Sequence, residues 1–449
     1  MNKLKVALVC SFSNSKVREH LPLSKRKLYM LARRLLRLTT KKGGYGDIAG
    51  WDTYMIELLR KRDDIDLTVI SAHSGLRRRV TSFDMDGVNY HFVRIEGATL
   101  LKHIIPSPSL WHRLNPMRPV VRRIIKKVRP DLIALIGAEN PHISGTVLGI
   151  KGIPLIVKCQ TIYNNPERKK TDIFDEKNAY VERIIFKDLN YVSVGTGMHC
   201  HLFREINTTA YNFCWNLGNL LPEVKPVEKE YDFVNFAMAM IPKKGYPDTI
   251  QALAIVKKQY PQVRLNLVGG GSIEGKKALQ SLVKELNLEE NVVFTPLFDR
   301  QEDLFQHLQK SRFAVLPCKM DSVSSTIRQA MHYGLPVVCY KTEGTPKINT
   351  ENDCVLIAEN GDVEDLAKQM IKLLENETLA VELRNNAKAY ATRWNDDEGN
   401  SNQMSRNFHA VVEHYYNGIP IPEELLCKDN QCKSNYNYGN KESGCKCYS

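Results

Sequence analysis

The stretch from Phe313 to Pro346, FAVLPCKMDSVSSTIRQAMHYGLPVVCYKTEGTP, carries the pattern that decides the fold. An apolar strand leads into a short polar loop with Asp321, and a helix follows with Gln329 on its first turns. A Gly-Leu-Pro break at 334–336 then leads directly into the next strand. Strand, loop, helix and strand in this order form a βαβ unit. Because the loop ends at a helix N-terminus, its backbone amides suit a phosphate or sugar oxygen.

The same alternation of β-rich apolar runs and helical patterns extends along the chain and predicts parallel α/β layers. One series of strand candidates precedes a charged, proline-containing segment near 222–232, and a second series follows it. The candidates are 4–10, 67–73, 88–95, 131–138, 154–160 and 191–196, then 233–240, 264–271, 291–297, 313–318, 336–341 and 354–359. This pattern predicts two doubly wound, Rossmann-like domains, with a ligand cleft between them at the carboxyl ends of the strands.

The composition of the chain suggests where the domains begin and end. We expect an N-terminal domain over 1–221 with a basic insertion at 15–43, and a second domain over 222–394. A helix at 395–418 is expected to return to the first domain, and a polar, disordered tail to follow at 419–449.

Length and composition exclude several classes of protein. The chain has 449 residues, of which 43% are hydrophobic, enough for two or three domains with substantial cores. It has no run of eighteen apolar residues, so we expect no transmembrane helix. The eleven cysteines are scattered and no secretion signal is recognisable, so we expect reduced thiols and a cytoplasmic protein.

The net charge of +13 calls for an anionic partner. Lys25–Lys42 carries eight basic residues and no acidic one, and Arg118–Arg129 repeats this basic amphipathic design. Such helices are typical of proteins at membrane surfaces, whereas a solvated basic face packed on a sheet is the alternative, favoured for the second helix. Nucleic acid is not expected, because the chain has no basic groove interleaved with aromatic residues and no zinc-finger spacing.

Two loops of the second half have the composition of a phosphate site. Lys243 and Lys244 lie between a strand that ends at Met240 and a helix start after Gly245. A lysine in this position is well placed to neutralise a diphosphate, although a solvated loop explains it as well. The glycines of LVGGGSIEG (267–275) allow close approach of a nucleotide, or form a plain tight turn.

Taken in order, these pieces resemble the nucleotide-binding half of the GT-B glycosyltransferases of family 4. The matching pieces are Lys244-Gly245, Val268 to Gly271, Asn291 to Phe294, Leu316 to Cys318, Gln329 to Met331 and Gly334 to Val338. The first half matches that family mainly in topology, with a glycine-rich loop, KGGYGDIAGW, at 42–51.

The resemblance implies transfer of a sugar from a UDP- or GDP-linked donor with retention of configuration, without a metal ion or a cofactor. Lys244 then stabilises the leaving diphosphate, and Asp321 contacts the sugar. The donor-binding residues implied are Gly44, Gly46, Lys243, Gly270, Ser324, Ser325, Thr326 and Gln329.

Three positions depart from the family pattern. Asp321 and Gln329 replace its two signature glutamates, and Ala239 replaces an arginine five residues before Lys244. Gln329 keeps its hydrogen-bonding capacity but loses a charge-assisted acceptor, which weakens ribose binding by about 1–2 kcal/mol. Lys243 and Arg328 are the candidates to replace the arginine.

The first half supplies candidates for the acceptor side. IGAENPH (136–142) ends a buried strand with Glu139, Asn140 and His142, and His73 ends another. We expect Glu139 to be catalytic and the other three to orient the acceptor, because strand C-termini face the cleft. A simple turn around Asn140-Pro141 is the alternative.

The sequence thus predicts a retaining glycosyltransferase of bacterial capsule or lipopolysaccharide synthesis, peripheral on the inner face of the plasma membrane. Its expected partners are a nucleotide-sugar, a glycan or polyprenyl-phosphate-linked acceptor and an anionic membrane surface. The alternatives are a catalytically silent GT-B scaffold that binds nucleotide and a nucleotide-sugar epimerase. The thin set of carboxylates and histidines in the expected cleft argues against the epimerase.

Overall fold

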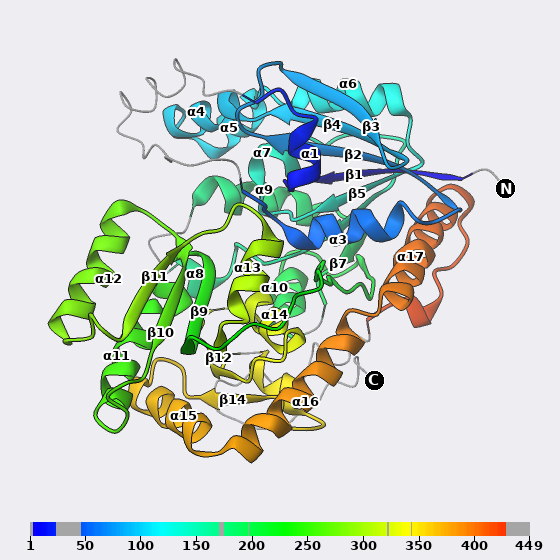
Figure 1. The fold of residues 1–449 in the computed structure, drawn as a ribbon. Helices are drawn as coiled ribbons and strands as arrows, with labels where there is room; N and C mark the ends of the chain where they lie inside the picture. Colours follow the sequence, from blue (N-terminus) through cyan, green and yellow to red (C-terminus); the bar gives the residue numbers. More distant parts are fainter. Residues whose placement is uncertain are drawn as a thin grey trace. The chain divides into compact units, whose positions relative to one another are not determined.

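The computed structural model describes residues 3–23, 46–169, 175–195, 197–320, 323–342 and 344–427 (Figure 1). They belong to two compact units, unit 1 (Met1–Gly218 with Asp397–Ser449) and unit 2 (Asn219–Asp396). The basic stretch 25–42, predicted to be a helix, lies outside the described residues.

Unit 1 is built on an eight-stranded sheet with the order β3-β4-β2-β1-β5-β6-β7-β8. Its strands are β1 (Leu4–Cys10), β2 (Ile65–His73), β3 (Val80–Met85), β4 (Val88–Arg94), β5 (Leu132–Ile136), β6 (Leu155–Lys158), β7 (Tyr191–Ser193) and β8 (Tyr211–Asn212). All neighbours pair in parallel except β3, which forms an antiparallel hairpin with β4. The sequence predicted neither β3, whose side chains are half-exposed, nor the two-residue β8.

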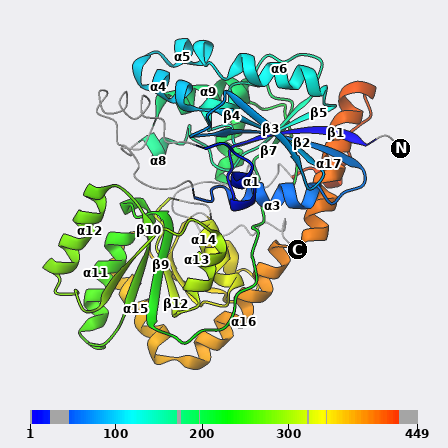
Figure 2. The ribbon, with the colours of Figure 1, turned by 45° about the horizontal axis from the view of Figure 1, so that its top comes forward.

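Helices cover both faces of this sheet (Figures 1 and 2). They are α1 (Ser15–Glu19), α3 (Gly50–Leu59), α4 (Glu96–Ile104), α5 (Pro108–Leu114), α6 (Arg118–Val128), α7 (Pro141–Ser144), α8 (Pro166–Lys169), α9 (Glu176–Lys187), α10 (Met198–Arg204) and α17 (Asp397–Asn417). Successive strand residues point to opposite faces, so β1 sends Val6 and Leu8 into the core beneath α3 and α17, and Ala7 and Val9 into the core beneath α4 to α10. The predicted helix over 118–129 is confirmed as α6.

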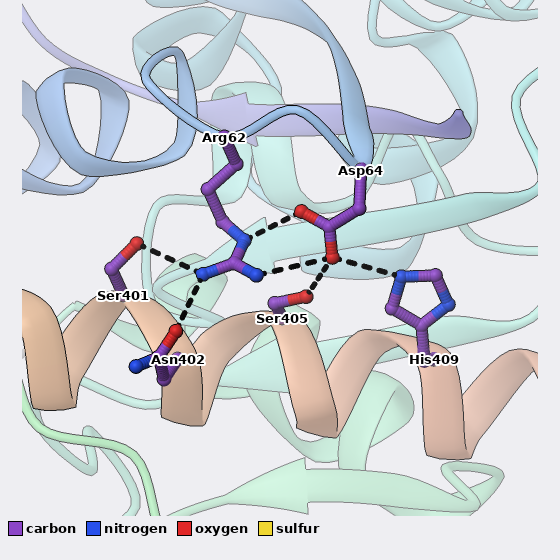
Figure 3. A network of polar contacts seen from close by, with 6 residues as sticks. All are labelled: Arg62, Asp64, Ser401, Asn402, Ser405 and His409. Carbon is purple, nitrogen blue, oxygen red and sulfur yellow. Dashed lines mark hydrogen bonds and ion pairs between the residues drawn. The ribbon is translucent and has the colours of Figure 1, made fainter. Parts of the chain in front are cut away.

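Helix α17 completes unit 1 although it is far along the chain. Its buried residues join the core beneath α3, and they include Met404, Phe408 and Val411. Asp64 accepts hydrogen bonds from Arg62 (2.6 Å) and from Ser405 (2.6 Å) of α17, and His409 Nε2 lies 3.2 Å from its Oδ2 (Figure 3). Apolar packing and this polar network together fix the helix on unit 1.

The residues after α17 correct the prediction of a disordered tail at 419–449. The short 3₁₀ helix η3 (Glu423–Leu425) follows α17, and Leu425 is buried in the core beneath α3. Leu426 forms an antiparallel bridge with Phe213, beside β8. Residues 419–427 are therefore ordered by apolar burial and backbone pairing, while 428–449 lie outside the described residues.

Unit 2 has a six-stranded, fully parallel sheet with the order β11-β10-β9-β12-β13-β14. Its strands are β9 (Tyr231–Ala239), β10 (Leu265–Gly270), β11 (Val292–Pro296), β12 (Ser311–Leu316), β13 (Val337–Tyr340) and β14 (Val355–Ala358). They are nearly continuous apolar runs because both faces are covered, and each overlaps a predicted strand.

The helices of unit 2 form two layers, one on each face of the sheet (Figure 2). They are η1 (Pro242–Lys244), α11 (Tyr246–Lys257), α12 (Ile273–Glu285), α13 (Gln301–Leu308), α14 (Ser325–His332), η2 (Thr345–Asn349), α15 (Val363–Glu375) and α16 (Glu377–Trp394). Polar residues cap several of them, as Ser272 does by accepting the amide of Gly275. Two doubly wound α/β units, as predicted, define the fold class.

Helix α6 has the basic amphipathic pattern that is typical of proteins at membrane surfaces. Its apolar side, with Val121 and Ile125, is buried against the sheet, and Arg123, Lys126 and Lys127 are exposed. The apolar side is therefore used by the fold, and only the basic side faces solvent. Within the described ranges, no helix combines the length and apolar character that crossing a membrane requires.

Candidate functional site

In unit 2, the loops after β9, β10 and β12 are locked to one another through their backbones. The amide of Met240 donates to Gly270 O (2.7 Å), and the amide of Lys319 donates to Lys243 O (3.1 Å). Gly245 has φ +74°, and a Cβ there would run into the carbonyl of Pro317. Only glycine therefore lets these loops approach so closely.

This packing brings Lys244 to the N-terminus of α14. Its Nζ lies 3.5 Å from Ser324 Oγ and 3.5 Å from Cys318 Sγ. Ser324 is the N-cap residue, and its hydroxyl lies 2.9 Å from that of Thr326. A lysine is unusual here because the amides of a helix N-terminus already create positive potential. An anion between these two positive groups would reduce their repulsion, so the arrangement is suited to an anion.

The other predicted donor residues of unit 2 lie in the same loops and in α14, whereas Gly46 belongs to unit 1. Ser325 begins α14, and Gly270 ends β10. Gln329 is buried, and its Nε2 lies 3.4 Å from Oδ1 of Asn219, a residue that the sequence did not single out. Asp321 and Gly44 lie outside the described residues.

The structure also shows how two basic residues near the donor loops are used. The Arg328 guanidinium lies 3.7 Å from the ring centroid of Trp394, a cation–π contact. Lys319 pairs with Asp248 at 2.9 Å, and Tyr340 donates to the same carboxylate. Stacking on Trp394 holds Arg328 in a structural role, which argues against its replacing the arginine missing at Ala239.

In unit 1, His73 is part of a polar network that reaches the glycine-rich loop. Its Nε2 lies 3.2 Å from Ser13 Oγ, the Ser13 hydroxyl accepts from Arg18, and Arg18 pairs with Asp47 at 2.7 Å. Asp47 directly follows Gly46 of the glycine-rich loop. Burial lowers the pKa of His73, so the imidazole is neutral near pH 7 and donates Nδ1–H to the carbonyl of Ser74.

Glu139, which follows β5, lies in a buried carboxyl cluster with Asp52. With its amide oriented to satisfy both neighbours, Gln160 donates to Glu139 Oε1 (3.1 Å) and accepts from Trp51 Nε1 (2.5 Å). Glu139 Oε2 and Asp52 Oδ1 are buried and have no hydrogen-bond partner among the described residues.

Burial dominates the protonation of this cluster. It raises the pKa of Glu139 to about 8, and burial together with the charge of Glu139 raises the pKa of Asp52. Glu139 is therefore largely protonated at neutral pH and can donate a hydrogen bond, and burial favours the neutral form of Asp52 as well.

The structure separates His142 from Glu139, although only two residues lie between them. The His142 ring makes an edge contact with Trp111, and Lys102 and Asp175 are among the charges that act on it. Burial lowers its pKa to about 3, so it is a neutral residue of the helical layer beside α4 and α9. Asn140 is the N-cap residue of α7 and caps it without a side-chain hydrogen bond.

Sequence reasoning missed Asp52, Trp51 and Gln160 as neighbours of Glu139. Trp51 ends the glycine-rich loop and Asp52 directly follows it, so their position at the end of that loop was the available signal. Gln160 ends the strand candidate 154–160 and lies just after β6, the neighbour of β5. Strand ends that are adjacent in a parallel sheet were therefore the second signal.

Comparison with known proteins relates unit 2 to a known family. Residues 220–394 match the family model of the glycosyl transferases group 1. An uncharacterized glycosyltransferase of Haemophilus influenzae is 25% identical over 169 residues, which cover 37% of this chain and 46% of that protein. The chain thus matches less than half the length of this relative.

Two solved structures resemble the whole chain. Sucrose-phosphate synthase from Thermosynechococcus elongatus has a TM-score of 0.68 and 17% identity, covering 91% of this chain and 98% of its own. HepE from Anabaena, in complex with UDP and glucose, has a TM-score of 0.62 and 16% identity, covering 90% and 99%. The chain therefore has the GT-B fold, and its residues 220–394 match the group 1 glycosyl transferases.

Proposed function

We propose that this protein transfers a sugar from a UDP- or GDP-linked donor to a glycan or lipid-linked acceptor, with retention of configuration. The observation that carries the proposal is the ammonium of Lys244 beside Ser324 at the N-terminus of α14. As the bond between the anomeric carbon and the diphosphate breaks, negative charge grows on the leaving oxygen. A lysine and helix-start amides, fixed before the reaction, stabilise that charge.

The acceptor oxygen bonds to the anomeric carbon as the diphosphate leaves, and its proton departs with the diphosphate. This chemistry requires the protein to supply positive potential and to orient the donor and the acceptor. The proposal includes neither a metal ion nor a cofactor. In unit 1, the protonated Glu139 and Asp52 are suited to hold a hydroxyl of the sugar or acceptor. Further support comes from HepE, a structure of the same fold that contains UDP and glucose.

The test combines binding and turnover. Calorimetry with UDP and GDP identifies the nucleotide, and hydrolysis of the corresponding nucleotide-sugars measures bond cleavage. Lys244→Ala should lower kcat by at least about a hundredfold, since it removes a charge that acts on the transition state. Lys277→Ala, an exposed lysine of α12, is the matched control and should behave as wild type. Nucleotide binding without hydrolysis, with any acceptor mixture, would instead support a silent scaffold.

The proposed acceptor is a polyprenyl-phosphate-linked or other lipid-linked glycan of bacterial capsule or lipopolysaccharide synthesis, met at an anionic membrane surface. Basic residues of α6 are exposed on unit 1, and α4 and α5 beside it expose Ile104, Leu110 and Leu114 (Figures 1 and 2). A basic surface beside exposed apolar side chains suits the interface of an anionic bilayer.

Vesicles test this membrane proposal. The protein should sediment with vesicles that contain anionic phospholipid at low salt, and much less at high salt, because salt screens the attraction. A variant with Arg123→Glu and Lys127→Glu should lose this binding while keeping nucleotide-sugar hydrolysis. Failure of the wild-type protein to bind such vesicles would contradict the proposal.

A further inference from the structure

Two adjoining hollows open in unit 2 at the end of the sheet opposite to the donor loops. Their volumes are about 430 and 460 Å³, and Lys229, Gln309, Tyr333 and Lys388 line both. Lys229 precedes β9, Gln309 precedes β12 and Tyr333 precedes β13. In a parallel sheet these amino ends lie together, away from the carboxyl ends where Lys244 and Ser324 are found.

The walls of these hollows carry more positive than negative charge. Lys229 donates to the carbonyls of Gln309 (2.6 Å) and Ser311 (3.0 Å), and Arg384 donates to the carbonyl of Gly334 (3.1 Å). These are backbone partners, which do not neutralise the charges. Burial and the charge of Arg384 lower the pKa of Lys229, in agreement with an excess of positive potential.

Acidic groups offset only part of this charge. Arg312, on the same wall, lies 3.1 Å from Asp232 Oδ1 and 3.8 Å from Glu377 Oε2. Glu223 lines the second hollow. Lys388, which lines both hollows, has no carboxylate within ion-pair distance among the described residues. An anion that binds beside Lys388 and Lys229 would thus gain attraction without first breaking an ion pair.

The remaining wall is apolar and partly aromatic. Tyr333 and Phe313 line the first hollow, and Leu221, Pro222 and Val224 line the second. The Tyr333 hydroxyl donates to Pro222 O at 2.8 Å, which fixes the ring. Volumes of this size match a small organic molecule rather than a single inorganic ion.

We propose that these hollows form a second anion-binding site, which takes a small phosphorylated organic molecule. The phosphate lies against Lys388 and Lys229, and the organic part lies against Tyr333 and the apolar wall. The site is distinct from the donor site and does not depend on transferase activity.

Helix α14 connects this second site to the donor loops. The hollows are lined by His332, Tyr333 and Gly334 at its carboxyl end, whereas Ser324 and Thr326 are at its amino end. Eight helical residues span about 12 Å, so the two sites lie at opposite ends of one short helix.

Phenyl phosphate is a suitable probe because it joins an aromatic ring to a phosphate and carries no nucleoside. Calorimetry with the full chain should detect saturable binding, stronger than that of inorganic phosphate. Lys388→Ala should weaken it at least about tenfold through loss of a charge-assisted contact, and Lys388→Glu should abolish it. Lys244→Ala and Lys277→Ala should leave it unchanged. Equal thermal unfolding midpoints for Lys388→Ala and wild type will show that the fold is intact.

Two results would overturn the proposal. Absence of saturable binding at millimolar phenyl phosphate would mean that Lys388 and Arg384 only complement the carboxyl end of α14, where cations are favourable. Binding that is lost in Lys244→Ala but kept in Lys388→Ala would place the probe in the donor site. Neither result depends on transferase activity, so failure of the second site and failure of the proposed function are distinguishable.

Discussion

The two candidate sites, one in each unit, differ in their electrostatics. In unit 2, Lys244 lies at the positive end of α14, where an anion would be attracted. In unit 1, burial raises the pKa of Glu139 and of Asp52, and the charge of Glu182 adds to this shift at Glu139, as the charge of Glu139 does at Asp52. The first site would therefore act through fixed charge, and the second through hydrogen bonds from carboxyls whose neutral form burial favours. Substitutions in each should have different signatures.

The largest expected effect is on the backbone that holds Lys244 in place. Gly245→Ala forces a Cβ into the carbonyl of Pro317 and puts a side chain at φ +74°. We expect unit 2 to lose about 3 kcal/mol of unfolding free energy, together with nucleotide binding. Chemical denaturation monitored by circular dichroism measures the first effect, and calorimetry with UDP the second.

Gly361→Ala is the matched control for this substitution. Gly361 has φ +83°, but a Cβ there would have no atom within 4 Å. Gly361→Ala should lower the unfolding free energy by only about 1 kcal/mol, because the new side chain lies on backbone in the left-handed region. Equal losses in the two variants would show that the loops of unit 2 are not locked as described.

The next effect concerns the protonated carboxyl of unit 1. The pKa of Glu139 is raised to about 8 from an ordinary 4.5, so the folded state binds more protons than the unfolded state between these values. Stability from this group is thus full below about pH 4.5 and falls as the pH rises through 8. Glu139→Gln should remove this loss and make unit 1 more stable than wild type above pH 8, by on the order of 1–3 kcal/mol.

Denaturation of the two proteins between pH 5 and pH 9 measures the difference. The exposed Glu289→Gln serves as the control and should follow the wild-type curve. If the difference in unfolding free energy between Glu139→Gln and wild type stayed constant over this range, Glu139 would be ionised throughout. The contrast between the two candidate sites would then disappear.

The smallest expected effect tests whether Lys244 can bind the diphosphate without a neighbouring arginine. Ala239→Arg restores a guanidinium at the end of β9. We expect it to tighten UDP binding only about three- to tenfold, the range of one partly solvated charge contact. An increase far above this would show that Lys244 leaves most of the diphosphate charge uncompensated. Ala239→Gln, similar in length and uncharged, separates charge from packing.

The sequence predicted unit 2 better than unit 1. The strands of unit 2 are continuous apolar runs that end at glycines and polar loops. The residues of each candidate donor loop are therefore adjacent in the sequence. Lys244, Gly270 and Ser324 were proposed from this local pattern together with the family resemblance. In unit 1, by contrast, β3 was missed because its alternating, half-exposed side chains produce no apolar run. Residues 419–427 were predicted to be disordered because their polar neighbours hid the burial of Leu425.

By itself, the sequence determined the fold class, the βαβ units and the loops of unit 2 in which the proposed anion site lies. These follow from hydrophobic periodicity and from loop residues adjacent in the chain. Only the tertiary structure decided that Lys244 meets Ser324, that Glu139 joins Asp52 while His142 points elsewhere, and that a basic hollow lies at the amino ends of the strands of unit 2. Such relations join residues far apart in sequence, and burial and packing, which set their charge and direction, arise only when the chain is folded.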